Sequence, residues 1–218
     1  GKTRVIAMQP MPGSHPVNNA SLDARALPGR TSPLRKQATF PAGSYLYQQG
    51  EPSSSMYLIR RGIASLERVN HRGERCIVHL LGPGALLGHE AMAHQPRWFD
   101  ARACTDTALE PVGPADNVAS GLVSRMLHEM AQFRVELHRS NARRRVLLLL
   151  ELLGKIHPPE TDSFWLPGRQ DMADLLDINH ITASRVVAGL YREGVLQRTA
   201  RHGLAGIAWD NVTRLLAS

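Results

Sequence analysis

Three polar side chains between residues 168 and 194 are spaced so that they would lie on one face of a helix. After Asn179, the segment HITASRVVAGLYR repeats apolar residues every three or four positions, which is typical of a helix with one buried face. The opposite face carries His180, Ser184 and Arg185. A guanidinium can donate two hydrogen bonds to O6 and N7 of a guanine, so this face has the chemistry of base recognition.

The segment before this helix must hold it in place. Asn179 can cap the second helix, because its side-chain oxygen can accept a free N–H of the next turn. Upstream, small Ala173 allows a close crossing, and the apolar stripe consists of Met172, Leu175 and Leu176. Two crossing helices joined by a tight turn indicate a helix-turn-helix. An ordinary helical hairpin with a solvated polar face has the same pattern and stays open at this point.

A basic hairpin is predicted directly after the second helix. Residues 195–209, VLQRTARHGLAGIAW, form two short β-type runs around the turn Arg201-His202-Gly203. The tip of such a hairpin, beside a recognition helix, can contact phosphates. The hairpin therefore favours a winged helix-turn-helix over a plain helical hairpin.

The charge is spread unevenly along the chain. The formal net charge is +7, and residues 139–218 hold eleven Lys and Arg against eight acids. A basic C-terminal third fits a polyanionic partner, although this excess alone is weak evidence. Cys76 and Cys104 are the only cysteines, which excludes a four-thiolate cluster and fits a reducing cytosol. The longest aliphatic run, Val146–Leu150, is too short to span a bilayer, so we expect a cytoplasmic chain without a membrane partner.

Composition and periodicity divide the chain into four parts. Residues 1–36 are rich in Pro, Gly, Ser and Asn and are predicted to be a flexible tail. Residues 37–116 alternate short β-type runs with glycine-bearing turns, which indicates an antiparallel barrel or roll. The predicted strands are Ser44–Gln48, Met56–Arg60, Ala64–Arg68, Cys76–Leu80 and Ala101–Ala103. Residues 117–141 belong to a long helix, and residues 142–218 form the domain with the helix-turn-helix.

The long helix carries a heptad pattern. Its apolar positions are spaced by 3, 4, 3 and 4 residues and consist of Val123, Met126, Met130, Phe133 and Leu137. A stripe of this kind usually packs inside its own chain. It is also the pattern of two helices that pair across a two-fold axis, so both interpretations stay open from spacing alone.

These segments resemble the CRP/FNR superfamily of bacterial transcription regulators. The sequence PAGSYLYQQGEPSSSMYLIRRGIASL is similar to the effector-binding β-roll of that superfamily, and residues 165–216 are similar to its DNA-binding domain. The resemblance covers about residues 38–216. It implies an α+β fold with an N-terminal antiparallel β-roll (a double-stranded β-helix), a long dimerisation helix and a C-terminal winged helix-turn-helix.

The resemblance also implies a function. A member would be a sequence-specific, cytoplasmic transcription regulator without catalytic activity, and RNA polymerase would be a further partner. It would bind double-stranded DNA at a near-palindromic site as a homodimer paired through the heptad stripe. The residues expected at the DNA are Arg169, Gln170, Asn179, His180, Ile181, Thr182, Ser184, Arg185, Arg201 and His202.

Base recognition should depart from the superfamily pattern at one position. Relatives typically have an acidic residue where this chain has Ile181, and an arginine where it has Arg185. An acid would accept a hydrogen bond from a cytosine amino group, whereas Ile181 offers only an apolar contact, best matched by a thymine methyl. We expect Arg185 to specify one guanine, and the base pair at Ile181 to be relaxed or T-leaning.

The effector segment departs further. Residues 84–103, GALLGHEAMAHQPRWFDARA, stand where cyclic-nucleotide-binding relatives have a Glu for the ribose and an Arg-Ser pair for the phosphate. Here His89 follows the glycine with Glu90 one position later, and Arg97 is followed by Trp98, which would place apolar bulk where the anion should sit. We expect an effector other than cAMP, or none, in a pocket near these four residues.

Three other functions share parts of this sequence pattern. A cupin-like metalloenzyme would use His79, His89, His94 or Cys104, but it needs a His-x-His pair, which the sequence lacks, so no metal site is predicted. A haem-dependent CO or NO sensor of the same superfamily would need an axial ligand, for which His89 is the candidate. A β-roll that controls something other than DNA also remains open.

Overall fold

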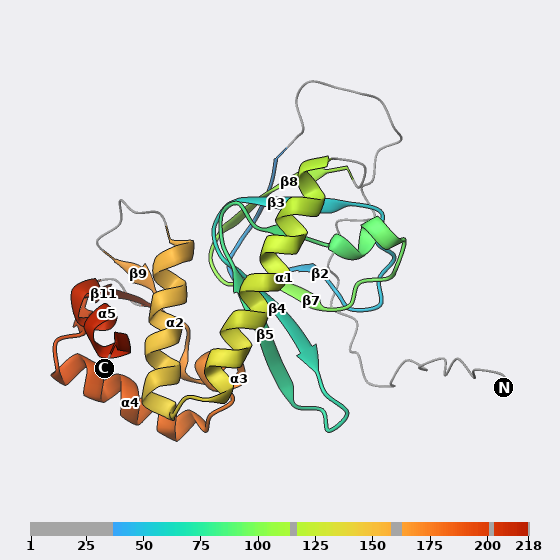
Figure 1. The fold of residues 1–218 in the computed structure, drawn as a ribbon. Coiled ribbons are helices and arrows are strands. Elements are labelled where there is room, and N and C mark those ends of the chain that lie inside the picture. Colours follow the sequence, from blue (N-terminus) through green and yellow to red (C-terminus); the bar gives the residue numbers. More distant parts are fainter. Residues whose placement is uncertain (1–36, 114–116, 158–162, 201–202, 218) are drawn as a thin grey trace.

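The chain folds into a β-roll, a long helix and a C-terminal helical domain with a small sheet (Figure 1). The computed structural model describes residues 37–113, 117–157, 163–200 and 203–217. Antiparallel sheets lie in the N-terminal half and most helices lie in the C-terminal half, so the predicted α+β class is confirmed.

The roll consists of two four-stranded antiparallel sheets that enclose an apolar core. One sheet has the order β1 (Ala38–Phe40), β8 (Thr107–Val112), β3 (Met56–Arg61), β6 (Leu86–Leu87). The other has the order β2 (Tyr45–Tyr47), β7 (Asp100–Ala103), β4 (Ala64–Val69), β5 (Arg75–Leu81). Alternate side chains such as Ile59, Leu66 and Leu109 point inward and are buried, as the period of two residues in a strand requires.

All five predicted strands are present, and three further strands were missed. Strand β8 has the sequence TALEPV, in which Glu110 and Pro111 weaken the β-type pattern. Tyr57 is the pairing partner of Pro111, which lies one residue from the end of β8, where the missing N–H removes little of the ladder. The short β1 and β6 carry too few residues for a period to be visible.

The long helix α1 (Asn117–His138) lies against the roll and ends before α2 (Ala142–Ile156). Residues 139–141 separate the two helices, and the Asn141 side chain accepts a hydrogen bond from the Arg144 N–H at 2.9 Å, which caps α2. The Ser140 hydroxyl donates to the Glu136 carbonyl at 2.7 Å. Local hydrogen bonds therefore stabilise the interruption between α1 and α2.

The heptad stripe of α1 packs against its own chain, which is one of the two interpretations that its spacing leaves open. Met126 and Met130 contact the roll core, and Val123 contacts a small cluster around Met56. Leu137 and Phe133 join the core of the C-terminal domain. The large apolar side chains that α1 exposes are Leu127 and Val135, at 48% and 58%. Spacing defines an apolar face, but it does not define what covers that face.

The C-terminal domain is a winged helix-turn-helix. It consists of α2, β9 (Phe164–Trp165), α3 (Arg169–Leu176), α4 (His180–Arg192), β10 (Leu196–Arg198), β11 (Leu204–Ile207) and α5 (Trp209–Ala217). Its core includes Leu149 of α2 together with the predicted apolar faces of α3 and α4, among them Leu176 and Val187. Strands β10 and β11 form the predicted antiparallel hairpin, and β9 pairs with β11.

The burial of His79 should make the stability of the protein depend on acidic pH. His79 on β5 is 3% exposed and meets the Phe133 ring edge-on at 5.5 Å. Burial, followed by the charge of Arg134, lowers its pKa to about 4. An unfolded chain protonates His near pH 6.5, so between these values the unfolded state binds more protons, and the free energy of unfolding falls as the pH falls.

We expect this group to remove about 3 kcal/mol of the free energy of unfolding between about pH 7 and about pH 4. Urea denaturation of wild type and His79→Leu at the two pH values measures it, because the variant should lose this part of the dependence. The exposed His71→Leu is the matched control and should keep the wild-type dependence. Equal dependence in His79→Leu and wild type would contradict the assignment.

Candidate nucleic-acid interface

Helix α4 buries its apolar side and exposes the predicted polar side. The Asn179 side chain accepts the Ile181 N–H at 2.8 Å, so the predicted cap is present. Ala183, Val187 and Leu190 are buried in the domain core. At the surface, His180, Ile181 and Arg185 are exposed, and Thr182 and Ser184 are partly exposed. The helix therefore has the predicted register.

Ile181 is the unusual member of this face. Its side chain is 57% exposed, although a large aliphatic group is normally buried. It lies in the first turn of α4, one turn before Arg185. An apolar and a cationic group thus stand next to each other on the outside of the helix.

The first turn of α3 holds the other predicted contacts. Arg169 is partly buried, and its Nη1 lies 3.9 Å from the sulfur of Met172. Gln170 is exposed, but its amide donates to Asp174 at 2.6 Å within the same helix. The predicted contacts Arg201 and His202 of the hairpin tip lie outside the described residues.

A groove rich in arginine lies between α3, α4 and the β10–β11 hairpin. It has a volume of about 670 Å³, and we call it the arginine groove. Its polar lining consists of Arg169, Arg192, Arg198, Ser184, Tyr191 and Thr199, with no acidic residue among the lining residues. The Arg198 guanidinium lies over the Tyr191 ring, 5.5 Å from its centre, which is the geometry of a cation–π contact. Three cations that line one groove have the charge to attract phosphate.

Sequence reasoning did not assign Arg192 and Arg198 to the site. Arg192 lies eight residues after Ser184, so the two share a helix face, and this signal was present in the sequence. Arg198 lies on β10, and the chain reversal between α4 and β10 brings it next to Tyr191 of α4. That approach is a tertiary contact without a sequence pattern.

The predicted effector residues divide into two pairs. Glu90 and Arg97 are buried inside the roll, whereas His89 is partly buried and Trp98 is 47% exposed. The His89 and Trp98 rings meet edge-on, 5.4 Å apart. The Trp98 ring therefore lies at the surface of the roll and not in its buried interior.

Arg97 occupies the interior instead. Its Nη2 donates to the Ser55 carbonyl at 2.8 Å, and its guanidinium lies 4.3 Å from the centre of the Tyr47 ring. Its Nη1 is 3.9 Å from a carboxylate oxygen of Glu90, whose other oxygen accepts the Trp98 N–H at 3.0 Å. A Cβ on Gly88 would lie 1.9 Å from Arg97 Nη1, so the guanidinium fills the space beside this glycine. The Arg97 guanidinium is thus held inside the roll by contacts with other residues of the roll.

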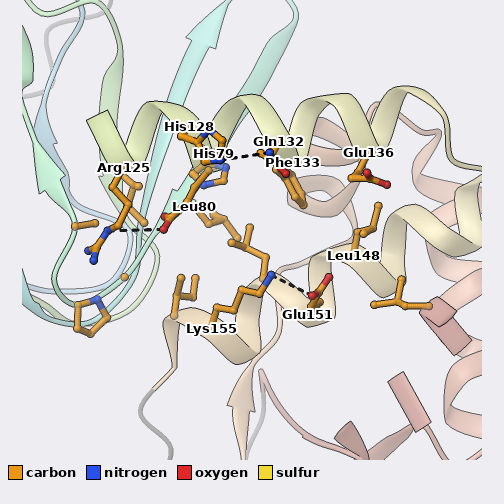
Figure 2. Close-up of a pocket in the computed structure, with 18 of the residues that line it drawn as sticks. His79, Leu80, Arg125, His128, Gln132, Phe133, Glu136, Leu148, Glu151 and Lys155 are labelled. Atoms are coloured by element: carbon orange, nitrogen blue, oxygen red, sulfur yellow. Dashed lines mark hydrogen bonds and ion pairs between the residues drawn. The ribbon is translucent and has the colours of Figure 1, made fainter. Parts of the chain in front are cut away.

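A larger cleft lies between the domains (Figure 2). It has a volume of about 890 Å³ and is bounded by α1, α2 and the end of β5. Leu80, Phe133 and Leu148 form its apolar wall, and ion pairs such as Lys155 with Glu151, at 3.0 Å, lie at its rim. No sequence pattern predicts this cleft, because its walls come from segments far apart in the chain. Within the described ranges, no three His, Cys, Asp or Glu side chains are grouped so that they could hold a metal ion.

The chain is similar to several known regulators. Residues 37–109, which form most of the β-roll, match the cyclic nucleotide-binding domain family. The transcriptional regulator SdrP of Thermus thermophilus is 27% identical over 176 residues, which cover 75% of this chain and 86% of SdrP. The nitrogen fixation regulation protein FixK of Rhizobium meliloti is 28% identical over 174 residues, covering 78% and 82% of the two chains.

Solved structures share the fold. The structure of FixK2 from Bradyrhizobium japonicum superposes with a TM-score of 0.71 at 20% identity, covering 85% of this chain and 98% of that one. A CRP/FNR-family transcriptional regulator from Thermus thermophilus has a TM-score of 0.69 at 24% identity, covering 84% and 99%.

A cyclic-nucleotide-binding roll joined by a helix to a winged helix-turn-helix defines a class of two-domain transcription regulators. The chain contains a cyclic nucleotide-binding domain and is similar over most of its length to transcription regulators such as SdrP and FixK. Of the helices that the structure describes, none has both the length and the apolar character needed to cross a membrane.

Proposed function

We propose that this protein is a sequence-specific DNA-binding transcription regulator of the CRP/FNR type, without catalytic activity. The observation that carries the proposal is the exposed side of α4, with Arg185 and Ile181, next to an arginine groove lined by no acidic residue. Readout of bases and binding of phosphates need these two surfaces side by side. In this proposal the protein acts in the cytoplasm together with RNA polymerase.

Each part of the surface has a separate role at the DNA. Helix α4 enters the major groove, where Arg185 donates two hydrogen bonds to a guanine. Ile181 contacts a thymine methyl, and its exposure supports this role because an apolar partner would remove it from water. Arg169, Arg192 and Arg198 bind the phosphate backbone, which adds affinity without sequence preference.

We further propose a homodimer that pairs through the outward side of α1. Leu127, Ala131 and Val135 recur every fourth residue and are exposed, so they form a continuous strip along the helix. Two copies related by a two-fold axis along this strip would present two α4 helices to a near-palindromic site. This strip replaces the heptad stripe as the dimer face.

Cyclic nucleotides are not the proposed effector. A cyclic phosphate needs a cation that it can reach, whereas the Arg97 guanidinium is buried and bonded to Ser55 and Tyr47 of its own roll. The proposal is therefore an effector other than cAMP or cGMP, or none.

Replacement of Arg185 and Arg198 by Ala should affect DNA binding in two distinct ways. Arg185→Ala should lose about 1–3 kcal/mol of discrimination at one guanine, because a bidentate base contact is removed. Arg198→Ala should weaken all sequences alike and make binding less dependent on salt, because a phosphate contact is removed. Site selection from random DNA and salt titration measure these effects, with Arg60→Ala in the roll as control. An unchanged guanine preference in Arg185→Ala would refute the proposed register.

Substitution on the two sides of α1 should separate dimerisation from folding. Val135→Asp should give folded monomers, because its side chain is exposed within one chain and covered only by the second copy. Phe133→Asp should instead lower the thermal midpoint, because Phe133 packs against the core. Analytical ultracentrifugation and thermal denaturation measure both, and an intact Val135→Asp dimer would exclude the proposed strip.

Neither cAMP nor cGMP should bind at micromolar concentration. Calorimetric titration of the full chain tests this, with Arg97→Lys as a second sample. Saturable micromolar binding to wild type would contradict the proposal, since the guanidinium would have to leave the roll interior.

A further inference from the structure

The interdomain cleft in Figure 2 has the size of a small-molecule site. Its volume of about 890 Å³ lies within the range of known ligand pockets, which is about 300–1,000 Å³. Its walls come from α1, α2, α5 and the end of β5. The cleft is therefore separate from the interior of the roll, where Arg97 is buried.

The walls of the cleft carry apolar side chains from both domains. Leu80 of β5 and Phe133 of α1 lie on one side, and Leu148 and Leu152 of α2 lie on the other. Phe133 and Leu152 pack against the core of the C-terminal domain and are only partly buried, so each also has surface that is open to the cleft. A ligand with an apolar body would remove this surface from water, which is favourable.

His79 of β5 gives the cleft a polar group without a partner. The residue is 3% exposed and lines the cleft, and its ring meets the Phe133 ring edge-on. Its Nδ1 is buried and has no hydrogen-bond partner among the described residues. Buried polar atoms are normally hydrogen-bonded, so an unused ring nitrogen beside a cavity is a position for a polar ligand atom.

The His79 ring is uncharged at neutral pH. Burial, followed by the charge of Arg134, lowers its pKa to about 4. Arg134 itself does not line the cleft, and its guanidinium donates to the backbone carbonyls of Leu175, Ile77 and Val78. The polar group offered to a ligand is thus a neutral imidazole, with one nitrogen that donates and one that accepts.

The charged side chains that line the cleft are equal in number for the two signs. They are three cations and three acids, namely Arg125, Arg144, Lys155, Glu129, Glu136 and Glu151. Lys155 pairs with Glu151 at 3.0 Å, and Arg125 lies 3.7 Å from Glu129. The lining therefore has no net charge that would select an anion or a cation. A charged ligand would lose water at the apolar walls without an opposite charge to replace it.

We propose that the interdomain cleft binds an uncharged, mainly apolar small molecule that carries a hydroxyl or carbonyl group. The apolar body lies between Phe133 and the leucines of α2, and the polar group forms a hydrogen bond with the His79 ring. A neutral imidazole can accept from a hydroxyl or donate to a carbonyl, so either group fits. This site is independent of the proposed function, since ligand binding is measured without DNA.

Four naphthalene derivatives, substituted at the same ring carbon, test the chemical class of the ligand. Naphthol carries a neutral hydroxyl, methylnaphthalene has no polar group, and naphthoate and naphthylmethylammonium carry opposite charges. Ligand-observed NMR titration of the full chain near neutral pH measures their affinities. Naphthol should bind about tenfold more tightly than methylnaphthalene, because it adds one hydrogen bond. It should also bind at least about tenfold more tightly than the two ions, because they lose more hydration.

Two variants test the position of the bound naphthol. His79→Phe keeps an aromatic ring beside Phe133 but removes both nitrogens, so affinity for naphthol should fall about tenfold, while affinity for methylnaphthalene should change by less than about twofold. Leu152→Trp fills the cleft from a partly buried position and should weaken both ligands by more than about tenfold, because two groups cannot share one space. The matched control is Val69→Trp, at a position that is 52% exposed and does not line the cleft, and it should change neither affinity.

A measurement on wild type does not depend on the folding of a variant. The nitrogen chemical shifts of the His79 imidazole should move when naphthol is added and should stay unchanged with methylnaphthalene. Unchanged shifts at saturation with naphthol would overturn the proposal, because the hydroxyl would then be bonded elsewhere. Equal affinity of wild type and Leu152→Trp for naphthol would place the ligand outside the cleft and would also overturn it. Failure of naphthol to bind, or an ion that binds as tightly as naphthol, would exclude the proposed class of ligand.

Discussion

The inward side of α1 is the constraint on which the rest of the structure depends. Met126 is buried in the core of the roll, and Leu137, further along the same helix, is buried in the core of the C-terminal domain. One rigid helix therefore belongs to two cores. Because this side packs within the chain, the large apolar side chains Leu127 and Val135 stay exposed on the outward side of the helix. The interdomain cleft in Figure 2 follows from the same arrangement, since α1 forms one of its walls.

Buried charge is handled in the same way in the roll and at the domain interface. A guanidinium or carboxylate taken from water is tolerated only when hydrogen bonds and opposite charge replace the water. Arg97 contacts the Ser55 carbonyl, the Tyr47 ring and Glu90. Glu67 forms ion pairs with two arginines. In the first case the result is a roll interior filled by its own side chain. In the second it is an ionised residue that directs Arg75 toward α3.

In the C-terminal domain, acidic and basic side chains lie on different sides. The acids of α3, Asp171 and Asp174, bind arginine side chains of the roll, whereas the cations around α4 remain at the surface. Residues 139–218 hold eleven basic and eight acidic residues, so their net charge is modest, yet this separation produces a groove lined by no acid. The distribution of charge over the surface is therefore more informative about a binding partner than the net charge is.

Local patterns in the sequence determined the elements and their exposed sides. The periods of the strands and of α3 and α4 follow from backbone geometry, so the exposed position of Arg185 was predictable, as was the Asn179 cap. Tertiary structure alone decided which surface covers the stripe of α1, that Arg97 points inward while Trp98 points outward, and that Arg198 meets α4. The physical reason is that periodicity marks an apolar face within one element, whereas its partner depends on contacts between distant segments. Charge pairing such as that of Arg75 with Asp171, 96 residues apart, leaves no local pattern at all.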